Sequence, residues 1–563
     1  MIRMEYNRYE KMKILKRKEN SNQKVKFFCN QIFLFLKKTG PVVLLLLLMA
    51  EESLAQKQKN GHLNITVIDS ATRQKTPVRV RLTQDDKPVK MLPEAAIGVM
   101  YGHWDHADGY AYQPDSSFYI NGSFEMDLPP GNYHLSISKG NEYLDQHHKL
   151  EVQSGKGIQK TYEMARWINM AERGWYSGDN HIHVRRSPRE DPLLMSWIQA
   201  EDIHAGVMLQ MGDFWQTYYA QYDWGEKGVY QEKDYILTTG QEDPRTPELG
   251  HALGMGATEG VRFKKDYYLY DKVFDRLHEL GGITGYAHQA ASFHGYRGLI
   301  LDGLRNKVDV LELLQFCVSD QPLITDNYYH LLDLGIPLTA VAGSDFPWCG
   351  TDHDSGPASR LAQIGNVRFY TYTGQPFSYR TWKEGLAAGH TFVSSGPIVE
   401  LSINDSLPGD HLNVSKGATL TISAKAFGHP SQVPLSRLEI VGHGEILAQV
   451  SVDDPDQSSS QLSIVLELPA DQGIWIAART FGKTKQVAHT TPIYITVENG
   501  SFHNPLTAPK YLALSEQYLN ELEHQLEEHS TDPEYQAWHY KAPLKKRINE
   551  TREIIEMLKA KFK

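Results

Sequence analysis

Cysteine is scarce in this sequence, which excludes a scaffold held together by disulfides. Only Cys29, Cys317 and Cys349 occur among 563 residues. Small secreted domains without a large core need many disulfides. Here Cys29 lies in a basic N-terminal segment, so at most Cys317 and Cys349 are left to form one. Apolar residues make up 41% of the chain, so each domain can be held by an ordinary hydrophobic core.

An excess of positive charge is also missing. The formal net charge is −10. Residues 1–55 hold eleven basic and five acidic residues, so the remaining chain has a net charge near −16. An acidic protein of this kind repels the phosphate backbone of nucleic acids. We therefore expect no nucleic-acid partner.

Long apolar runs are absent apart from residues 41–50, and this run is shorter than the roughly 20 residues that span a bilayer. It follows a basic stretch and precedes the small residues Ser53 and Ala55, which is the pattern of a secretory signal peptide. We expect residues 1–55 to be a leader cleaved near Ala55, and the protein to be periplasmic or secreted without stable membrane insertion. The alternative is an N-terminal membrane anchor, because residues 27–36 are also apolar, although Lys37 and Lys38 separate the two runs.

The flanking segments of the chain are distinguished by the period of their apolar residues. In residues 61–165, apolar and polar residues alternate with a period of two, as at Leu63, Ile65 and Val67. This alternation predicts an all-β sandwich. The phrase LPPGNYHLSISKGNEY in this segment resembles carboxypeptidase-regulatory-like sandwiches. Residues 397–498 show the same alternation and predict a second sandwich. Residues 510–563 carry two apolar stripes at helical spacing, which predict a helical hairpin.

Residues 166–396 differ from both flanks. Short apolar runs, such as residues 205–211 and 283–287, alternate with amphipathic helical stretches. Near-continuous apolar strands separated by such helices indicate a parallel α/β arrangement, and the length suits a barrel. The predicted fold is therefore multidomain, with a central α/β barrel, a β-sandwich on each side of it and a C-terminal helical hairpin.

Two histidines separated by one residue give the strongest chemical signal. Alternate side chains of a strand point the same way, so His181 and His183 can bind one metal ion. Four more residues with metal-binding side chains, histidine, glutamate or aspartate, follow later apolar stretches. Because the strand ends of a parallel barrel meet at one face, we expect these side chains to lie close together. Each residue alone is as well explained as a cap or a hydrogen-bonded core residue, but the ordered set favours a metal site. The six expected ligands are His181, His183, Glu242, His251, His288 and Asp345.

Four motifs, GWYSGDNHIH, AHQ, AGSD and LAAGHTFVSSGPIVELSIND, carry a family resemblance. They resemble the PHP (polymerase and histidinol phosphatase) metallohydrolases, and within them the carbaryl-hydrolase-like (CehA/McbA) branch. The resemblance covers roughly residues 166–405 and implies a distorted seven-stranded (β/α) barrel. It also implies that His181, His183 and Asp345 bind a first metal and that Glu242 bridges to a second. His251 and His288 would complete the second metal.

Members of this family often hold a third metal through three more histidines, and this chain departs from the pattern at all three places. No histidine lies between Val184 and Ile203, Asp213 stands near the end of the second strand, and Phe346 follows Asp345. We therefore predict a two-metal site. The substitute ligands to consider are His204, His294 and, best placed in its polar loop, His353. His294 is alternatively a substrate contact, and Asp213 a carboxylate that orients a ligand.

Mixed imidazole and carboxylate ligands suit Zn, Mn or Fe, and a pair of divalent ions can activate a hydroxide. We predict hydrolysis of an ester-like bond (phosphoester, carboxylic ester or carbamate) in a small-molecule or glycan-linked substrate. Glu242, Asp345 and Arg185 are the expected catalytic residues. Arg185 and Arg186 follow the histidine pair and are expected to bind an anionic group, unless they are simply a solvated pair. The resemblance also places Ser394 and Ser395 near the pocket.

A second function class stays open. The two sandwiches can be the working parts, binding carbohydrate or cell-envelope material beside a degenerate barrel. The missing third-metal ligands favour that interpretation, and the complete set of six remaining ligands opposes it.

Overall fold

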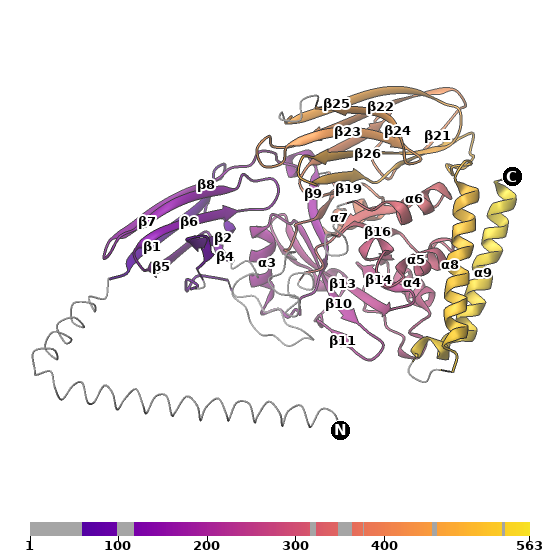
Figure 1. Cartoon of the computed structure of the whole chain (residues 1–563), viewed down its shortest axis with the longest axis horizontal. Helices are drawn as coiled ribbons and strands as arrows, with labels where there is room; N and C mark the ends of the chain where they lie inside the picture. The colour runs from indigo at the N-terminus through magenta and orange to yellow at the C-terminus, as the bar shows by residue number, and fades with distance from the viewer. Residues whose placement is uncertain are drawn as a thin grey trace, which may run out of the picture.

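The computed structural model describes residues 59–89, 91–97, 117–315, 323–346, 363–374, 376–452, 459–531 and 535–562. The expected leader, the three cysteines and His353 lie outside these residues. Three parts surround a central body (Figure 1): a β-region at the left that holds the first strands of the chain, a second β-region above the body, and a helical pair at the right. Among the described residues, no helix is both long enough and apolar enough to cross a membrane.

The N-terminal β-region contains two small sheets packed around one core. β1 pairs with β5 and β8, while β2 pairs with β3, β4 and β6, and β6 pairs with β7. The predicted alternation is confirmed, because Leu63, Ile65 and Val67 are all buried between the sheets. The strands are β1 Gly61–Asp69, β2 Pro77–Gln84, β3 Lys87–Pro88, β4 Phe118–Asn121, β5 Ser123–Leu128, β6 Gly131–Ser138, β7 Gln146–Val152 and β8 Gly157–Met164.

A large curled mixed sheet forms the central body. β9, β10 and β13 run parallel, as do β15, β16 and β17, and β17 lies against β9 where the sheet curls round. These strands are almost entirely buried, because helices cover the outside of the sheet. They are β9 Trp175–Ile182, β10 Ala205–Gly212, β13 Tyr235–Thr246, β14 Gly250–Met255, β15 Ile283–Tyr286, β16 Val310–Leu314 and β17 Thr339–Ala342, with the short β11 Thr217–Tyr218 and β12 Tyr230–Glu232.

The sheet departs from the predicted parallel arrangement at β14. This strand runs antiparallel to both β13 and β15. Only residues 247–249 connect β13 to β14, and parallel strands need a crossover of a dozen or more residues. The expectation that the ligand-type residues lie beyond the ends of strands is also wrong for Glu242, which lies inside β13.

Helices pack on the outside of the curled sheet. α4 covers β14 and β15, and its buried face carries Val273, Phe274 and Leu277. α3 lies between β13 and the N-terminal strands β2 and β4, so it joins the two regions. The helices of the body are α3 Asp191–Ala200, α4 Tyr270–Glu279, α5 Gly295–Gly303, α6 Asp326–Asp333 and α7 Tyr379–Ala387.

The second β-region continues the central sheet. β18 pairs with β9, and β19 pairs with both β18 and β27, so the hydrogen-bonded sheet runs on past the predicted boundary at residue 396. A three-stranded sheet, β20–β22–β25, packs against this extension. The strands are β18 Arg368–Tyr372, β19 Thr391–Ser394, β20 Ile398–Ile403, β21 His411–Val414, β22 Ala418–Phe427, β23 Leu435–Gly442, β24 Glu445–Ser451, β25 Gln461–Ala470, β26 Ile474–Gly482, β27 Val487–Thr490 and β28 Ile493–Val497.

The C-terminal helices α8 (Ala508–Glu528) and α9 (Lys541–Lys561) confirm the predicted helical pair, and they lie side by side in Figure 1. α8 packs on α5 and α6, and its apolar stripe, formed by Leu519, Leu522 and Leu526, is fully buried. Pro543 lies in the first turn of α9. Proline is tolerated there because the first N–H groups of a helix have no partner within the helix.

The buried face of α8 makes a direct test of this packing. Leu522→Ala should lower the free energy of unfolding by about 2–5 kcal/mol, because it leaves a cavity in the core. Leu506, just before α8, is 87% exposed, so Leu506→Ala is the matched control. This substitution should change the free energy of unfolding by less than about 0.5 kcal/mol. Urea unfolding followed by circular dichroism measures both. Equal effects would contradict docking of α8 on the body.

Candidate metal centre

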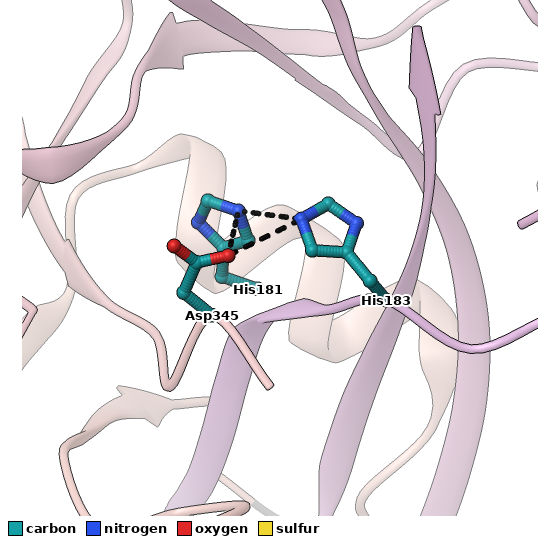
Figure 2. A group of neighbouring side chains, drawn as sticks. All are labelled: His181, His183 and Asp345. Carbon is teal, nitrogen blue, oxygen red and sulfur yellow. Dashed lines mark hydrogen bonds and ion pairs between the residues drawn. The ribbon is translucent and has the colours of Figure 1, made fainter. Parts of the chain in front are cut away.

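The histidine pair stands where β9 leaves the sheet. His181 is near the end of β9 and His183 lies just beyond it, and their Nε2 atoms are 3.1 Å apart. Asp345 follows β17 and meets both rings, with Oδ1 3.4 Å from His181 Nε2 and 3.3 Å from His183 Nε2 (Figure 2). Both histidine side chains are fully buried.

Glu242, His251 and His288 lie on the other side of this group. Glu242 Oε1 is 2.7 Å from His251 Nδ1 and 3.6 Å from His288 Nε2. The same carboxylate reaches the first group, since its Oε2 is 3.3 Å from His183 Nε2. Asp345 also spans the two halves, because its Oδ2 is 3.3 Å from His288 Nε2. The structure therefore brings all six predicted ligands together.

The spacing of these atoms suits metal ions. Ligands bonded to one ion at about 2.0–2.2 Å lie about 3–3.5 Å from one another in a tetrahedral shell, and most of the distances above fall in or near that range. Three buried groups have ligand atoms that all lie within 4.8 Å of one another. They are His181, His183 and Asp345; Glu242, His251 and His288; and His181, His288 and Glu312.

Hydrogen bonds orient the imidazoles toward this point. His183 Nδ1 faces the Leu209 carbonyl at 3.3 Å, and His288 Nδ1 faces Ser292 Oγ at 2.8 Å. Each contact leaves Nε2 pointing at the carboxylates, and His288 Nε2 is buried without a hydrogen-bond partner among the described residues. A partner on the far nitrogen fixes the orientation of a metal-binding histidine.

Asp179 ties the ligand-bearing backbones together. Its Oδ1 accepts hydrogen bonds from the backbone N–H groups of His181 and Ser344, and its Oδ2 accepts one from Gly365. The carboxylate thus connects β9 to the segment that carries Asp345. Asp345 itself has a φ of 53°, which is unfavourable for a residue other than glycine and places its side chain on the histidines.

The electrostatics of the group follow from its burial and its neighbours. Burial alone would raise the pKa of Glu242, but Arg245, His251 and His181 bring that pKa well below its ordinary value. Burial and the nearby Arg245 lower the pKa of His251 to about 3. Burial opposes protonation of His181, yet Glu312, Asp345 and Glu242 raise its pKa well above the ordinary value. A metal that binds His181 Nε2 therefore displaces a proton.

The two arginines after the histidine pair have different surroundings. Arg185 is exposed. Arg186 is buried, and it donates to Asp191 Oδ1 at 2.9 Å and to the Gly228 carbonyl at 3.0 Å. Those contacts give Arg186 a role in holding the segment before α3.

The other candidate residues take part in local structure. Asp213 accepts backbone hydrogen bonds from Trp215 and Gln216 and so closes a turn. His294 is exposed, with Nδ1 2.8 Å from the Pro247 carbonyl. The hydroxyls of Ser394 and Ser395 bond to the carbonyls of Pro397 and Val487 at the entry to the second β-region.

Sequence reasoning missed two residues that contact the ligands. Glu312 lies on β16, with Oε1 2.9 Å from His181 Nδ1. Arg245 lies opposite His251 in the β13–β14 ladder, and its Nε is 3.1 Å from Glu242 Oε2. Glu312 stands in the apolar stretch LELLQF, where a lone carboxylate is costly without a partner. That mismatch was the available signal for Glu312, and Arg245 had none.

No family model matches the chain, and no curated protein matches it. Among solved structures, a streptococcal ancillary pilin has 15% identity and a TM-score of 0.14, over 23% of this chain and 38% of that chain. An engineered protein has 11% identity and a TM-score of 0.13, over 38% of this chain and 48% of that chain. The chain thus covers less than half of either structure, and likenesses this low bear on neither fold nor function.

His204, a predicted substitute ligand, is a core histidine. It is buried, its Nδ1 is 2.9 Å from Ser177 Oγ, and its ring stacks on Tyr235 with centroids 4.8 Å apart. Burial lowers its pKa from 6.5 to about 4, although Asp202 opposes that shift.

This pKa predicts acid sensitivity. Between pH 6.5 and 4, His204 is protonated in the unfolded chain but neutral in the folded chain. The free energy of unfolding therefore decreases as the pH falls through this window. From pH 7 to 5 the loss from this residue should be about 2 kcal/mol. His204→Phe keeps a ring against Tyr235 and should remove this contribution to the pH dependence of the free energy of unfolding. Urea unfolding at several pH values measures it, and parallel curves for both proteins below pH 6.5 would contradict the assignment.

Proposed function

We propose that this protein is a metal-dependent hydrolase that cleaves an ester-like bond at a dinuclear centre. The observation that carries the proposal is the convergence of four imidazoles and two carboxylates, all buried, at the spacing of metal ligands. Isolated histidines and carboxylates are seldom buried together, because their burial is costly unless they are paired or bind metal. Two triads of ligands supply one such set for each ion.

The division of ligands follows from the distances. His181, His183 and Asp345 would hold one ion, and His251 and His288 the other, with Glu242 between them. When bound, a pair of divalent ions polarises the scissile group and lowers the pKa of an attacking water toward about 7. The mixed nitrogen and oxygen set suits Zn, Mn or Fe.

The resemblance of four sequence motifs to the PHP metallohydrolases supports the same proposal from the sequence. In that interpretation the curled sheet is the family's distorted barrel and the antiparallel β14 one of its distortions. The leader expected over residues 1–55 would deliver the enzyme to the periplasm or the outside of the cell. Its substrate would then be an ester of the cell envelope or of the medium.

Arg245 is a better candidate than Arg185 for recognition of an anionic substrate group. Its Nε pairs with Glu242, and its side chain is 21% exposed. Its contacts with Glu242 Oε2 and His251 Nδ1 both run from Nε, and a guanidinium also carries Nη1 and Nη2 as a pair of donors. Guanidinium groups bind carboxylates and phosphates through such paired donors. Phe293, 53% exposed and stacked on His251 at 4.4 Å, adds an apolar surface beside it.

The metal content and activity of purified protein test the proposal. We expect two tightly bound divalent ions per chain by elemental analysis, together with hydrolysis of chromogenic phosphate or carboxylate esters in the presence of Mn or Zn. His183→Ala should lose metal affinity and rate by at least about 100-fold, since outer partners of a ligand alone contribute about 10–100-fold. The exposed His294→Ala is the control and should retain both.

Two outcomes would contradict this assignment. Three tightly bound ions per chain would remove the two-metal site. Background rates in both the wild type and His183→Ala, with no bound metal, would favour the alternative of a carbohydrate- or envelope-binding protein beside an inactive centre.

The choice between the two arginines has its own test. Arg245→Met should lower kcat/KM for an anionic chromogenic ester by about tenfold or more, because hydrogen bonds to charged groups contribute about 1.5–3 kcal/mol. The same change should affect a neutral ester of the same leaving group much less, and Arg185→Met should affect neither. Selective loss with Arg185→Met would instead support the role that the sequence predicted for Arg185.

A further inference from the structure

Glu312 is a buried carboxylate that contacts two of the six predicted ligands, His181 and His288. It lies on β16, and its side chain has no exposure to solvent. Its Oε1 is 2.9 Å from His181 Nδ1, and its Oε2 accepts a hydrogen bond of 2.7 Å from the backbone N–H of His288. One carboxylate therefore contacts a ligand from each half of the centre.

We propose that Glu312 is a positioning residue that sets the affinity of the centre for its metals by holding His181 and the His288 backbone. The inference rests on the dinuclear centre proposed above. With Nδ1–H of His181 directed at Glu312, the Nε2 lone pair of that ring is left for the metal. A carboxylate on the far nitrogen also makes an imidazole a stronger ligand.

The contrast with His183 shows what Glu312 adds. His183 Nδ1 faces the neutral carbonyl of Leu209 at 3.3 Å, a longer contact than the one between His181 and Glu312. His181 thus has a charged partner and His183 a neutral one. The two rings of the histidine pair are therefore unequal, and His181 is the stronger ligand of the first ion.

The charge around Glu312 also calls for a cation. Arg245 pairs with Glu242, whereas in the described part of the chain no Lys or Arg pairs with Glu312. Its one ionisable partner there is the imidazole of His181. Burying a carboxylate is costly, and divalent ions held by His181 would add positive charge close to Glu312.

Close packing holds Glu312 in this place. A Cβ atom on Gly343, just after β17, would lie 2.3 Å from His181 Cβ and 2.7 Å from Glu312 Oε1. Such distances are too short for any side chain. Gly343 is therefore required for β16 and β17 to bring the carboxylate and the imidazole together.

The experiment compares Glu312→Gln with the wild type in the full-length protein. Zn²⁺ affinity is measured by competition with a chromophoric chelator, and the Co²⁺-loaded protein gives a visible spectrum that reports ligand geometry. In glutamine an NH2 group replaces one of the two oxygens that accept from His181 and from the His288 N–H, so we expect Zn²⁺ binding about 10–100-fold weaker, with an altered Co²⁺ spectrum. Glu312→Asp keeps the charge and should bind Zn²⁺ more tightly than Glu312→Gln.

Glu142→Gln is the matched control. Glu142 is equally buried, and its Oε2 also accepts a backbone N–H, from Met170 at 2.9 Å, but it lies in an ion pair with Arg166 away from the centre. This variant should keep wild-type Zn²⁺ affinity and the wild-type Co²⁺ spectrum.

Two results would overturn the proposal in distinguishable ways. If Glu312→Gln lowers the thermal stability of the metal-free protein but keeps wild-type Zn²⁺ affinity and the Co²⁺ spectrum, Glu312 is only structural. If Glu312→Gln does not fold, unchanged affinity and spectrum in Glu312→Asp would likewise show that Glu312 is only structural. If the wild type itself binds no metal, the dinuclear centre fails and the role of Glu312 fails with it.

Discussion

Buried negative charge is the constraint on which this structure depends. Glu242, Asp345 and Glu312 bring three carboxylates into one small volume, and none is more than 9% exposed. The effective penalty for burying an unpaired ion is several kcal/mol. Arg245 and the surrounding imidazoles offset part of that penalty, and metal ions would offset the remainder. This cost is the reason why the proposed function is assigned to the buried carboxylates and imidazoles and not to the β-regions.

The local backbone is shaped by the need to bring these groups together. Asp345 and His288 both have positive φ values, 53° and 56°, in a region that non-glycine residues seldom adopt. Gly343 leaves room for His181 and Glu312 to approach β17. Asp179 connects the backbone of β9 to the segment before Asp345 through three N–H groups. Together these features bring the imidazoles and carboxylates close to one another.

The flanking parts brace this arrangement from outside. Arg166, next to the N-terminal β-region, forms a two-point ion pair with Asp202 beside the central sheet. At the opposite side, Arg547 of α9 pairs with the buried Asp302 of α5. The helix α5 begins just after the loop that holds His288, so α9 supports one wall of the centre. Removal of one partner of such a buried ion pair costs about 3–5 kcal/mol of folding free energy. These pairs therefore stabilise the contacts between the body and its flanks.

Local patterns in the sequence determined the β-strands of both flanks, the two C-terminal helices and the six candidate ligand residues, because periodicity and residue type are local properties. The positions of Glu312 and Arg245 were decided only by tertiary structure. In the sequence Glu312 is only a polar residue within an apolar strand, and its contact with His181 forms only when the sheet curls. Arg245 becomes a neighbour of Glu242 and His251 only through the antiparallel pairing of β13 with β14. Direction and pairing of strands depend on contacts between distant segments, which no single stretch of sequence encodes. The same reason explains why the predicted boundary at residue 396 is crossed by a continuous sheet.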